Sequence, residues 1–302
     1  MFKSKNGMSR ALVRRETTAG YLFLLPSLFF FVTFVLYPMF LCIYTSFFDS
    51  NMGKNAVDVF VGLGNYKELF QDKIFLGALK NTVLIVVVAV PTVCAFSLWV
   101  ATAIYDMKPA LTSAFRCIFY LPVVTGSVAV TVVWKWMYNN RYGVFNYIFK
   151  SLGIIDQNIN WLGDARFALW CIILILFTTS VGQPIVLYVS ALGNVDHSLI
   201  EAAEVDGANR RQVFWKIKWA QIMPTTLYIL IITTINSFQC FALIQLLTSG
   251  GPTHSTDTIM YYIYYTAFKL YRYGYGNAMG VVLMVIIAVL SAVQFKPGQR
   301  SD

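Results

Sequence analysis

Charged residues are scarce in this sequence of 302 residues. They make up 12% of the chain, whereas an ordinary soluble domain carries about a quarter. Hydrophobic residues make up 58%, and the mean hydropathy is +0.63. No Asp, Glu, Lys, Arg or His occurs in six long apolar stretches, which are residues 21–48, 82–105, 117–134, 167–192, 219–247 and 273–295. This composition argues against a soluble globular protein and predicts a chain that lies in a membrane.

Several signatures of catalysis and energy conversion are also absent. The sequence has no HExxH, no GxSxG and no paired carboxylates within the apolar stretches, so a membrane enzyme or receptor is disfavoured. It has no GxxxxGK[ST] loop, so a nucleotide that drives it must bind a partner. A proton-driven carrier usually marks its ion path with titratable side chains, and the stretches carry none. We therefore predict no catalytic residue and no cofactor in this chain.

Neither a metal site nor nucleic-acid binding is expected. His197 and His254 lie in loops assigned to opposite sides of the membrane, and the five cysteines form no CxxC pair. The net charge of +9 comes from loops that flank the apolar stretches. The topology of a membrane protein explains basic residues in such loops.

The length of the apolar stretches predicts an all-α polytopic membrane protein with six transmembrane helices. At about 1.5 Å of rise per residue, even 117–134 covers about 27 Å, close to the hydrocarbon thickness of roughly 30 Å. The first stretch is too long for a cleaved signal peptide. We expect a basic cytoplasmic arm at 1–20, a transmembrane domain at 21–295 and a cytoplasmic tail at 296–302, with both termini cytoplasmic.

The loop at 193–222 carries the strongest functional pattern. Ser198 can cap a short helix with Glu201 three residues on, and Gly207 would end that helix. A second helical pattern follows, with an apolar stripe of Val213, Phe214 and Ile217. Two short helices joined at a glycine would form a compact cytoplasmic knob. Such a knob could dock in a cleft of a soluble partner, or it could lie on the bilayer surface.

The residues of this loop resemble a known motif. Glu201-Ala202-Ala203, then Gly207, then Ile217 are similar to the EAA loop of ABC importer permeases, EAA-x3-G-x9-I-x-L-P. The resemblance implies that the knob, with Phe214 on its apolar stripe, couples this chain to an ATPase subunit. The sequence departs from the motif at Trp219-Ala220, which stand in place of Leu-Pro.

Other segments resemble the carbohydrate-uptake branch of these permeases. They include LLPSLFFFVTFVLYPMF, FVGLGNYKELF and LLTSGGPTHSTDTIMYYIYYTAFKLYRYGYGNAMG, in the order of that branch. The resemblance implies a type I ABC importer permease fold in a bacterial-type inner membrane. It implies a heterodimer with a second permease, a cytoplasmic ATPase dimer that binds ATP and Mg, and an extracytoplasmic solute-binding protein that delivers sugar. The alternative is a stand-alone secondary carrier or channel for a small polar solute.

Two further sets of residues are candidates for binding. Polar residues within the fourth and fifth stretches should face the bundle, and Ser237, Cys240 and Ile244 share one face of a continuous helix. The resemblance to the maltose-type importer implies a sugar site on the fifth helix, so the predicted solute path consists of Gln183, Asn236, Ser237, Gln239, Cys240 and Ile244. Ordinary interhelical packing is the alternative for each of them. Gly250, Gly251 and Pro252 predict a helix stop on the outside. The resemblance implies that this region faces the solute-binding protein.

Overall fold

The structure is a computed structural model, and it describes residues 10–50 and 58–295. The first half contains α1 (Arg10–Phe31), π-helical turn η1 (Val32–Leu36), α2 (Tyr37–Thr45), β1 (Phe48–Asp49), β2 (Val59–Phe60), α3 (Gly64–Gln71), α4 (Lys73–Tyr105), α5 (Pro109–Val124), α6 (Ser127–Met137) and α7 (Val144–Ser151). The second half contains α8 (Ala168–Ser180), α9 (Gly182–Gly193), α10 (His197–Val205), α11 (Arg210–Val213), η2 (Phe214–Lys218), α12 (Trp219–Phe238), α13 (Ala242–Leu247), α14 (Ile259–Tyr264), η3 (Tyr265–Lys269) and α15 (Tyr273–Phe295). The described chain is therefore almost wholly helical, with one two-stranded antiparallel pair. Residues 1–9 of the expected arm and the tail 296–302 lie outside the described residues.

Within residues 10–50 and 58–295, five helices are long and apolar enough to cross a membrane: Glu16–Thr45, Lys73–Tyr105, Ala168–Gly193, Arg210–Leu247 and Tyr273–Phe295. The stretch 117–134, which was expected to form one transmembrane helix, is bent in the structure. That stretch divides into α5 and α6, which meet at 95°. The chain bends there because Thr125 and Gly126 both adopt extended backbone angles (ψ 128° and 140°) and leave the helix. The count is six spans only if this bent pair is taken as one.

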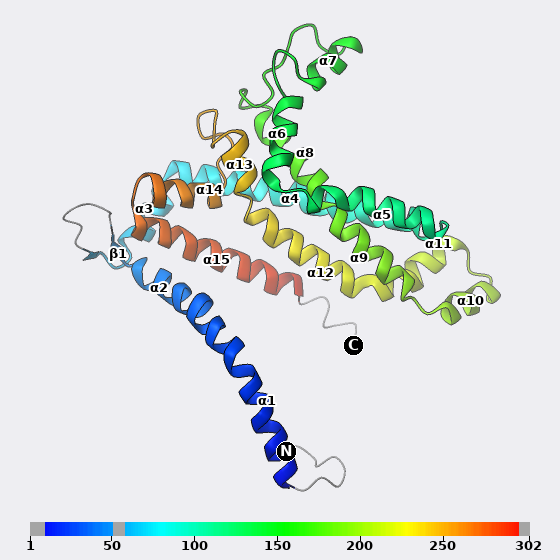
Figure 1. Cartoon of the computed structure of the whole chain (residues 1–302). Helices are drawn as coiled ribbons and strands as arrows, with labels where there is room; N and C mark the ends of the chain where they lie inside the picture. Colours follow the sequence, from blue (N-terminus) through cyan, green and yellow to red (C-terminus); the bar gives the residue numbers. More distant parts are fainter. Residues whose placement is uncertain (1–9, 51–57, 296–302) are drawn as a thin grey trace.

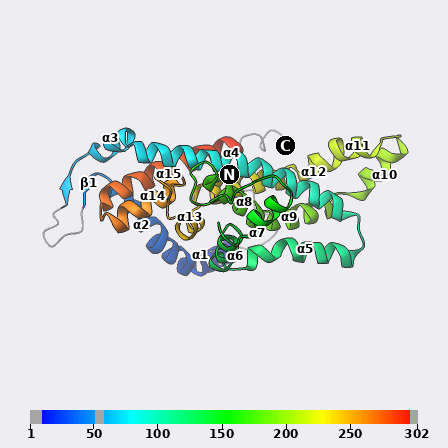
Figure 2. The same cartoon turned by 90° about the horizontal axis from the view of Figure 1, so that it is seen from above.

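The long helices run lengthwise and pack around α4 (Figures 1 and 2). One fully buried cluster joins α4 to α9 and α12 and includes Val93, Ile185, Tyr188 and Ile222. In Figure 1, α10 and α11 lie at one end of this bundle, and α3, α14 and the strand pair lie at the other. We refer to these as the α10 end and the α3 end.

The α1 part of the first span lies outside this packing, whereas α2 packs against α15 and its Thr45 hydroxyl accepts from the side-chain amide of Asn277 (2.7 Å). In Figure 1, α1 projects away from the bundle, and none of the most apolar window of Glu16–Thr45 is buried. Its large side chains are exposed, for example Phe23 at 85% and Phe34 at 68%. An apolar surface of this size requires lipid or another protein to cover it.

A single carboxylate joins three helices at the α3 end. Asp72 caps α4 by accepting hydrogen bonds at Oδ1 from the backbone N–H groups of Ile74 (2.8 Å) and Phe75 (3.3 Å). Its Oδ2 accepts from the hydroxyls of Tyr262 on α14 (2.7 Å) and Tyr275 on α15 (2.8 Å). Burial raises the pKa of Asp72, but these four hydrogen bonds outweigh it and hold the pKa below its ordinary value. The ionised carboxylate therefore stabilises this junction.

Replacing Asp72 with Asn should destabilise the folded chain. The oxygen of the asparagine amide can still accept the hydrogen bonds of the helix cap. Its NH₂ group, however, would face the hydroxyls of Tyr262 and Tyr275, which donate to the carboxylate in the wild type. Loss of these two hydrogen bonds should lower the free energy of unfolding by about 2 kcal/mol. A lower melting temperature of the purified protein, followed by intrinsic fluorescence, would show this. Asp156→Asn, at an exposed loop position, is the matched control and should leave the melting temperature unchanged.

The stability difference between wild type and Asp72→Asn should depend on pH. Because folding lowers the pKa of Asp72, its carboxylate stabilises the folded chain fully above the pKa of the unfolded state, about 3.9. This stabilisation is lost as the pH falls through the lower pKa of the folded state. The difference in melting temperature between wild type and Asp72→Asn should hold above about pH 5 and close below about pH 4. A difference that persists undiminished to pH 3 would contradict the role of the carboxylate.

Candidate functional site

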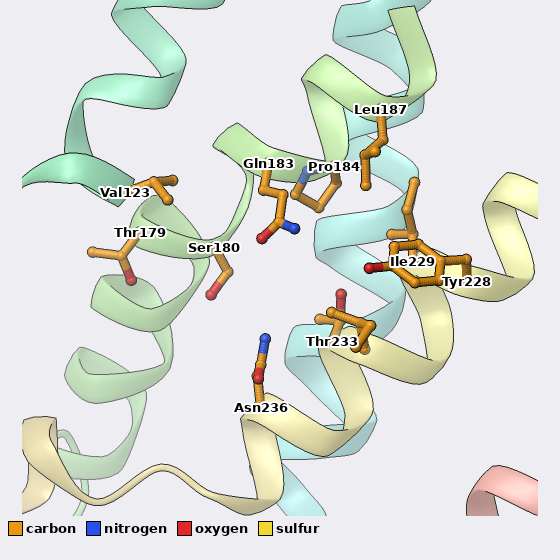
Figure 3. Close-up of a pocket in the computed structure, with 11 residues that line it drawn as sticks. Val123, Thr179, Ser180, Gln183, Pro184, Leu187, Tyr228, Ile229, Thr233 and Asn236 are labelled. Atoms are coloured by element: carbon orange, nitrogen blue, oxygen red, sulfur yellow. The ribbon is translucent and has the colours of Figure 1, made fainter. Parts of the chain in front are cut away.

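A polar cavity opens in the middle of the bundle, between α5, α9 and α12 (Figure 3). Its volume is about 170 Å³. Its lining consists of Val123, Thr179, Ser180, Gln183, Pro184, Leu187, Tyr228, Ile229, Ile232, Thr233 and Asn236, none of which is charged. The side chains of Gln183 and Asn236 are exposed in this single chain. An amide on a membrane span is costly against lipid, so these two groups require a hydrated path or a second protein beside them.

Close packing at one glycine shapes this cavity. A side chain at position 182 would collide with the backbone carbonyl oxygen of Phe119 on α5. Gly182 therefore lets α9 approach α5 closely at the turn of helix that precedes Gln183. This approach places Val123 of α5 beside the polar groups of Thr179 and Ser180.

The structure divides the residues of the predicted solute path into two groups. Gln183 and Asn236 lie together on the cavity, and Gln239 is exposed just after α12. The others are buried in the chain's own packing and do not line the cavity, namely Ser237 (2% exposed), Cys240 (6%) and Ile244 (0%).

The prediction of one helical face over 237–244 is wrong. It assumed a continuous helix, but α12 ends at Phe238 and α13 begins at Ala242. The Thr258 hydroxyl donates to the carbonyl of Cys240 (2.8 Å) and satisfies a backbone group that the break exposes. Because the axis is interrupted, the spacing of Ser237, Cys240 and Ile244 no longer places them on a common side.

Four polar residues of the cavity were missed by the sequence analysis: Thr179, Ser180, Tyr228 and Thr233. A signal for two of them was present, because Thr179 and Ser180 lie four and three positions before Gln183 in a stretch that is mostly apolar. Residues at this spacing gather on one side of a helix. No comparable pattern distinguishes Tyr228 from other aromatic residues of the spans.

At the α10 end, the loop 193–222 forms the expected knob of two helices. Helix α10 ends at Val205, and Gly207 reverses the chain with φ of 82°. Asn209 then caps α11 reciprocally with Gln212: each side chain accepts from the other residue's backbone N–H, at 2.9 and 2.8 Å. The two helices and the glycine turn are thus confirmed.

The cap of α10 differs from the prediction. Asp196, rather than Ser198, is the N-terminal cap, and its Oδ1 accepts from the backbone N–H of Ser198 (2.9 Å). Hydrogen bonds from Ser198 hold the pKa of Asp196 below its ordinary value, so the carboxylate is ionised at the positive end of the helix. The proposed capping pair of Ser198 and Glu201 is wrong because the helix begins earlier than the sequence pattern indicated.

The predicted coupling residues lie around two hollows of the knob. One hollow, of about 620 Å³, lies between the knob and the end of α4, and its lining includes Glu201, Phe214 and Lys218. The other, of about 310 Å³, is lined in part by Ala203, Gly207 and Ile217. The side chains of Glu201 and Ala202 are exposed, whereas Phe214 and Ile217 are half-buried. The acidic and alanine positions therefore form the accessible surface, and the apolar stripe holds the knob together.

The knob is joined directly to the polar cavity. From Arg210 to Phe238 the chain is helical without interruption, through α11, η2 and α12. At about 1.5 Å per residue, a helix of this length extends roughly 40 Å. A rigid displacement of the knob would therefore also move Thr233 and Asn236 in the cavity.

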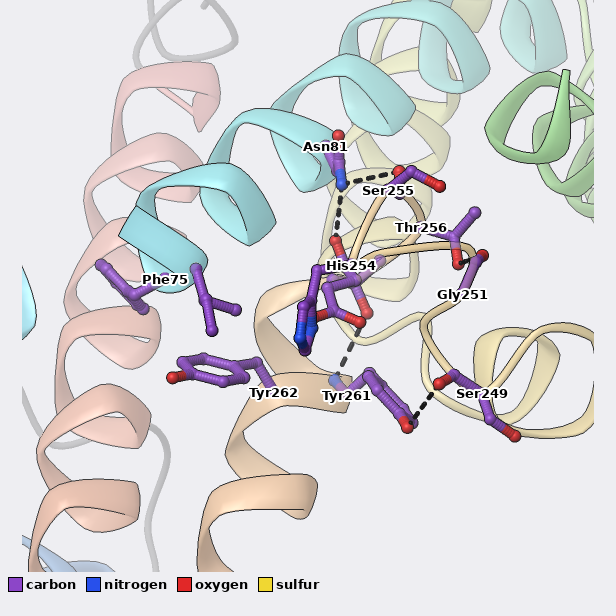
Figure 4. Close-up of polar contacts among 12 residues, drawn as sticks. Phe75, Asn81, Ser249, Gly251, His254, Ser255, Thr256, Tyr261 and Tyr262 are labelled. Atoms are coloured by element: carbon purple, nitrogen blue, oxygen red, sulfur yellow. Dashed lines mark hydrogen bonds and ion pairs between the residues drawn. The ribbon is translucent and has the colours of Figure 1, made fainter. Parts of the chain in front are cut away.

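The glycine-proline turn lies in a closely bonded loop at the α3 end (Figure 4). Gly250 has φ of 81° and is buried, and the Gly251–Pro252 peptide bond is cis. The turn confirms the predicted helix stop, since α13 ends at Leu247. Gly250, Gly251 and Pro252 were predicted to face the solute-binding protein. The two residues that follow the turn, Thr253 and His254, are more exposed than these three.

Side chains of α4 hold this loop against the bundle. Asn81 donates to the carbonyls of Ser255 and Asp257 (both 3.0 Å), and Thr82 accepts from the backbone N–H of Ile259 (3.0 Å). Figure 4 shows the Asn81 contacts. His254 Nδ1 lies 2.6 Å from Asp257 Oδ2, and burial raises the pKa of Asp257. Within residues 10–50 and 58–295, no three His, Cys, Asp or Glu side chains gather as a metal site would require.

Comparison with known proteins identifies the family. The model of binding-protein-dependent transport system inner membrane components matches residues 21–296. The probable ABC transporter permease protein YesP of Bacillus subtilis is 33% identical over 94% of this chain and 91% of its own length. The lactose transport system permease protein LacF of Rhizobium radiobacter is 32% identical over 94% of this chain and 95% of its own length.

A solved structure shows the same fold. It is that of a bacterial alginate ABC transporter in complex with an alginate pentasaccharide-bound periplasmic protein. The TM-score is 0.81 at 24% identity, and the match covers 95% of this chain and 96% of the other. This likeness confirms the predicted permease fold of type I ABC importers. By both its sequence and its fold, the chain belongs to the family of binding-protein-dependent transport system inner membrane components.

Proposed function

We propose that this permease is one half of the channel of an ATP-driven importer for an uncharged sugar or oligosaccharide. A second permease forms the other half, an ATPase dimer binds ATP and Mg at the α10 end, and an extracytoplasmic solute-binding protein delivers sugar at the α3 end. The α10 end and both termini are cytoplasmic, because the basic arm before the first span favours the cytoplasmic side of a bacterial-type inner membrane. This chain hydrolyses nothing itself.

The uninterrupted helix from the knob to the cavity carries the proposal. A transporter that draws its energy from a separate ATPase needs a rigid link between the docking surface and the solute path. Helices α11 and α12 with η2 supply this link from Arg210 to Asn236. A two-state movement of the ATPases would then open the cavity alternately to each side of the membrane.

The chemistry of the cavity supports an uncharged, hydroxyl-rich solute. Amides and hydroxyls, from Gln183, Asn236, Ser180 and Tyr228, can both donate and accept hydrogen bonds, as a sugar does. None of the eleven lining residues is Arg or Lys, the usual partners of carboxylates and phosphates. Alginate, the cargo of the structural relative, is an acidic polysaccharide. A neutral sugar such as the lactose of the relative LacF suits this cavity better.

Purification from membranes through a tag on this chain should recover the complete importer. The proposal expects a second permease and an ATPase in the eluate, with ATP turnover that rises when binding protein loaded with a neutral oligosaccharide is added. Stimulation by acidic oligosaccharides alone would contradict the assignment of substrate. Recovery of this chain alone under gentle extraction would instead support a stand-alone carrier.

Replacing Gly207 with Leu should uncouple ATP hydrolysis from uptake. Its φ of 82° strains an L-residue, and no atom lies within 4 Å of an added Cβ, so the effect comes from the backbone and not from a clash. Strain of about 1–2 kcal/mol should lower sugar uptake per ATP about tenfold. Transport and ATPase activity measured together in proteoliposomes would show this.

Two variants control the Gly207 experiment. Gly207→Asn should retain most coupling, because asparagine tolerates positive φ. Gly153→Leu introduces similar strain at φ of 67° in equally open space, but far along the chain from the knob, and should leave coupling intact. Equal loss in all three variants would contradict a specific role for the knob.

Replacing Gln183 and Asn236 with Leu should impair uptake without loss of assembly. Removal of two amides from the cavity takes away hydrogen bonds worth about 1 kcal/mol each, so uptake at low sugar concentration should fall about tenfold or more. Gln245→Leu makes the same chemical change on α13, outside the cavity, and is the control. Unchanged uptake in the double variant would show that the amides only pack.

A further inference from the structure

Residues 138–167, between α6 and α8, form a lobe with an aromatic core of its own. Figure 1 shows α6 and α7 rising out of the bundle. The rings of Tyr138, Phe145 and Trp161 pack together, with centroids of Tyr138 and Phe145 4.8 Å apart. Buried Asn146 fixes this core, because its side chain accepts from Trp161 Nε1 (3.0 Å) and bonds both backbone groups of Ile159. The lobe is therefore a defined structure and not a loose connection.

An apolar slot of about 200 Å³ lies where this lobe meets α8. Its lining consists of Tyr138, Phe145, Phe149, Trp161, Phe167, Trp170, Cys171 and Leu174. The Tyr138 hydroxyl donates to the Cys171 carbonyl (3.4 Å), and the Trp161 N–H is taken by Asn146. These polar atoms are already bonded within the protein, so the slot gives water few partners and is poorly suited to hold it.

The slot opens on the side of the span that faces away from the polar cavity. Trp170 and Leu174 form its α8 wall and are 52% and 42% exposed. At about 100° per residue, Thr179 lies roughly 180° around α8 from Trp170. Because Thr179 lines the polar cavity, the slot lies on the opposite face of α8, where a membrane span can meet lipid.

Further features of the lobe suit the boundary between hydrocarbon and head groups. Tyr147, Ile148 and Leu152, on and just after α7, are exposed at 76%, 43% and 66%, and Lys150 is exposed beside them. Amphipathic helices of this composition lie in the interface plane, and Trp and Tyr gather there. The slot thus opens beside the apolar exterior of α8, where Trp170 and Leu174 are exposed.

We propose that the slot between the α6–α8 lobe and α8 holds an acyl chain of a membrane phospholipid. The chain would fill a hollow that water fills poorly and would fix the lobe against the span. The inference rests on the membrane location of α8 and does not depend on which end of the protein is cytoplasmic. Its failure would therefore leave the proposed transport function standing.

Photo-cross-linking in the assembled complex would test this directly. The complex is reconstituted with a phosphatidylcholine that carries a diazirine in one acyl chain, irradiated and digested, and the labelled peptides are identified by mass spectrometry. We expect labels on peptides that contain Phe145–Phe149 and Phe167–Leu174. Leu174→Trp should fill the slot and lower this labelling at least fivefold.

Val285→Trp adds the same bulk at an exposed position of α15, far from the slot, and should leave the labelling unchanged.

If Leu174→Trp does not assemble, lipids brominated in the acyl chain provide a second measurement. They should quench the half-buried Trp161, so Trp161→Phe should lose part of the quenchable emission. No label on the slot in wild type, or no difference in quenching with Trp161→Phe, would overturn the proposal. Cross-links from the slot to the second permease would also overturn it.

Discussion

The helix from Arg210 to Phe238 is the constraint on which the rest of this structure depends. It is at once half of the knob, a wall of the bundle core and a wall of the polar cavity. Ile222 and Ile229, on its inner face, are fully buried against α4 and α9, so the helix cannot bend freely along its length. A helix that is packed in this way is expected to move as a unit. The proposed coupling between the knob and Asn236 would therefore need only this packing and no charged residues within the spans.

Uncharged side chains satisfy backbone groups where the helices are interrupted. Where α12 ends, Thr258 bonds the Cys240 carbonyl, and where the outer loop returns, Asn81 bonds two carbonyls at once. Charged groups connect helices at the α3 end, where Asp72 joins three of them and Arg272 pairs with Glu68 at 2.7 Å. A membrane interior requires such an arrangement, because a backbone group without a partner costs several kcal/mol there. The lining of the polar cavity likewise consists of uncharged residues.

The sequence was sufficient for the features that depend on composition and short spacing. The last span, 273–295, has the same bounds in the structure, and the two knob helices meet at Gly207 as expected. Features that depend on tertiary contacts could not be predicted in this way. The bend after Val124 and the break after Phe238 occur within stretches that carry no charged residue and were expected to be continuous helices, and the break is stabilised by Thr258, twenty residues farther along. Gln183 and Asn236 line one cavity, whereas Ser237 and Cys240 are buried away from it, and a solute path through the cavity stays a prediction.

The exposed surfaces suit the proposed pairing of this chain with a second permease. A polar cavity with Gln183 and Asn236 open to the exterior of the chain would place amides against lipid if the protein acted alone. In the proposed importer, a second permease across the cavity would remove this cost and close a path between the two chains. The α1 part of the first span has the opposite character, since its exposed large side chains from Leu22 to Phe31 are apolar and lipid or a partner can cover them without loss. The distribution of polar and apolar exposure thus suits a protein partner on the face that carries the amides and hydrocarbon on the faces that lack them.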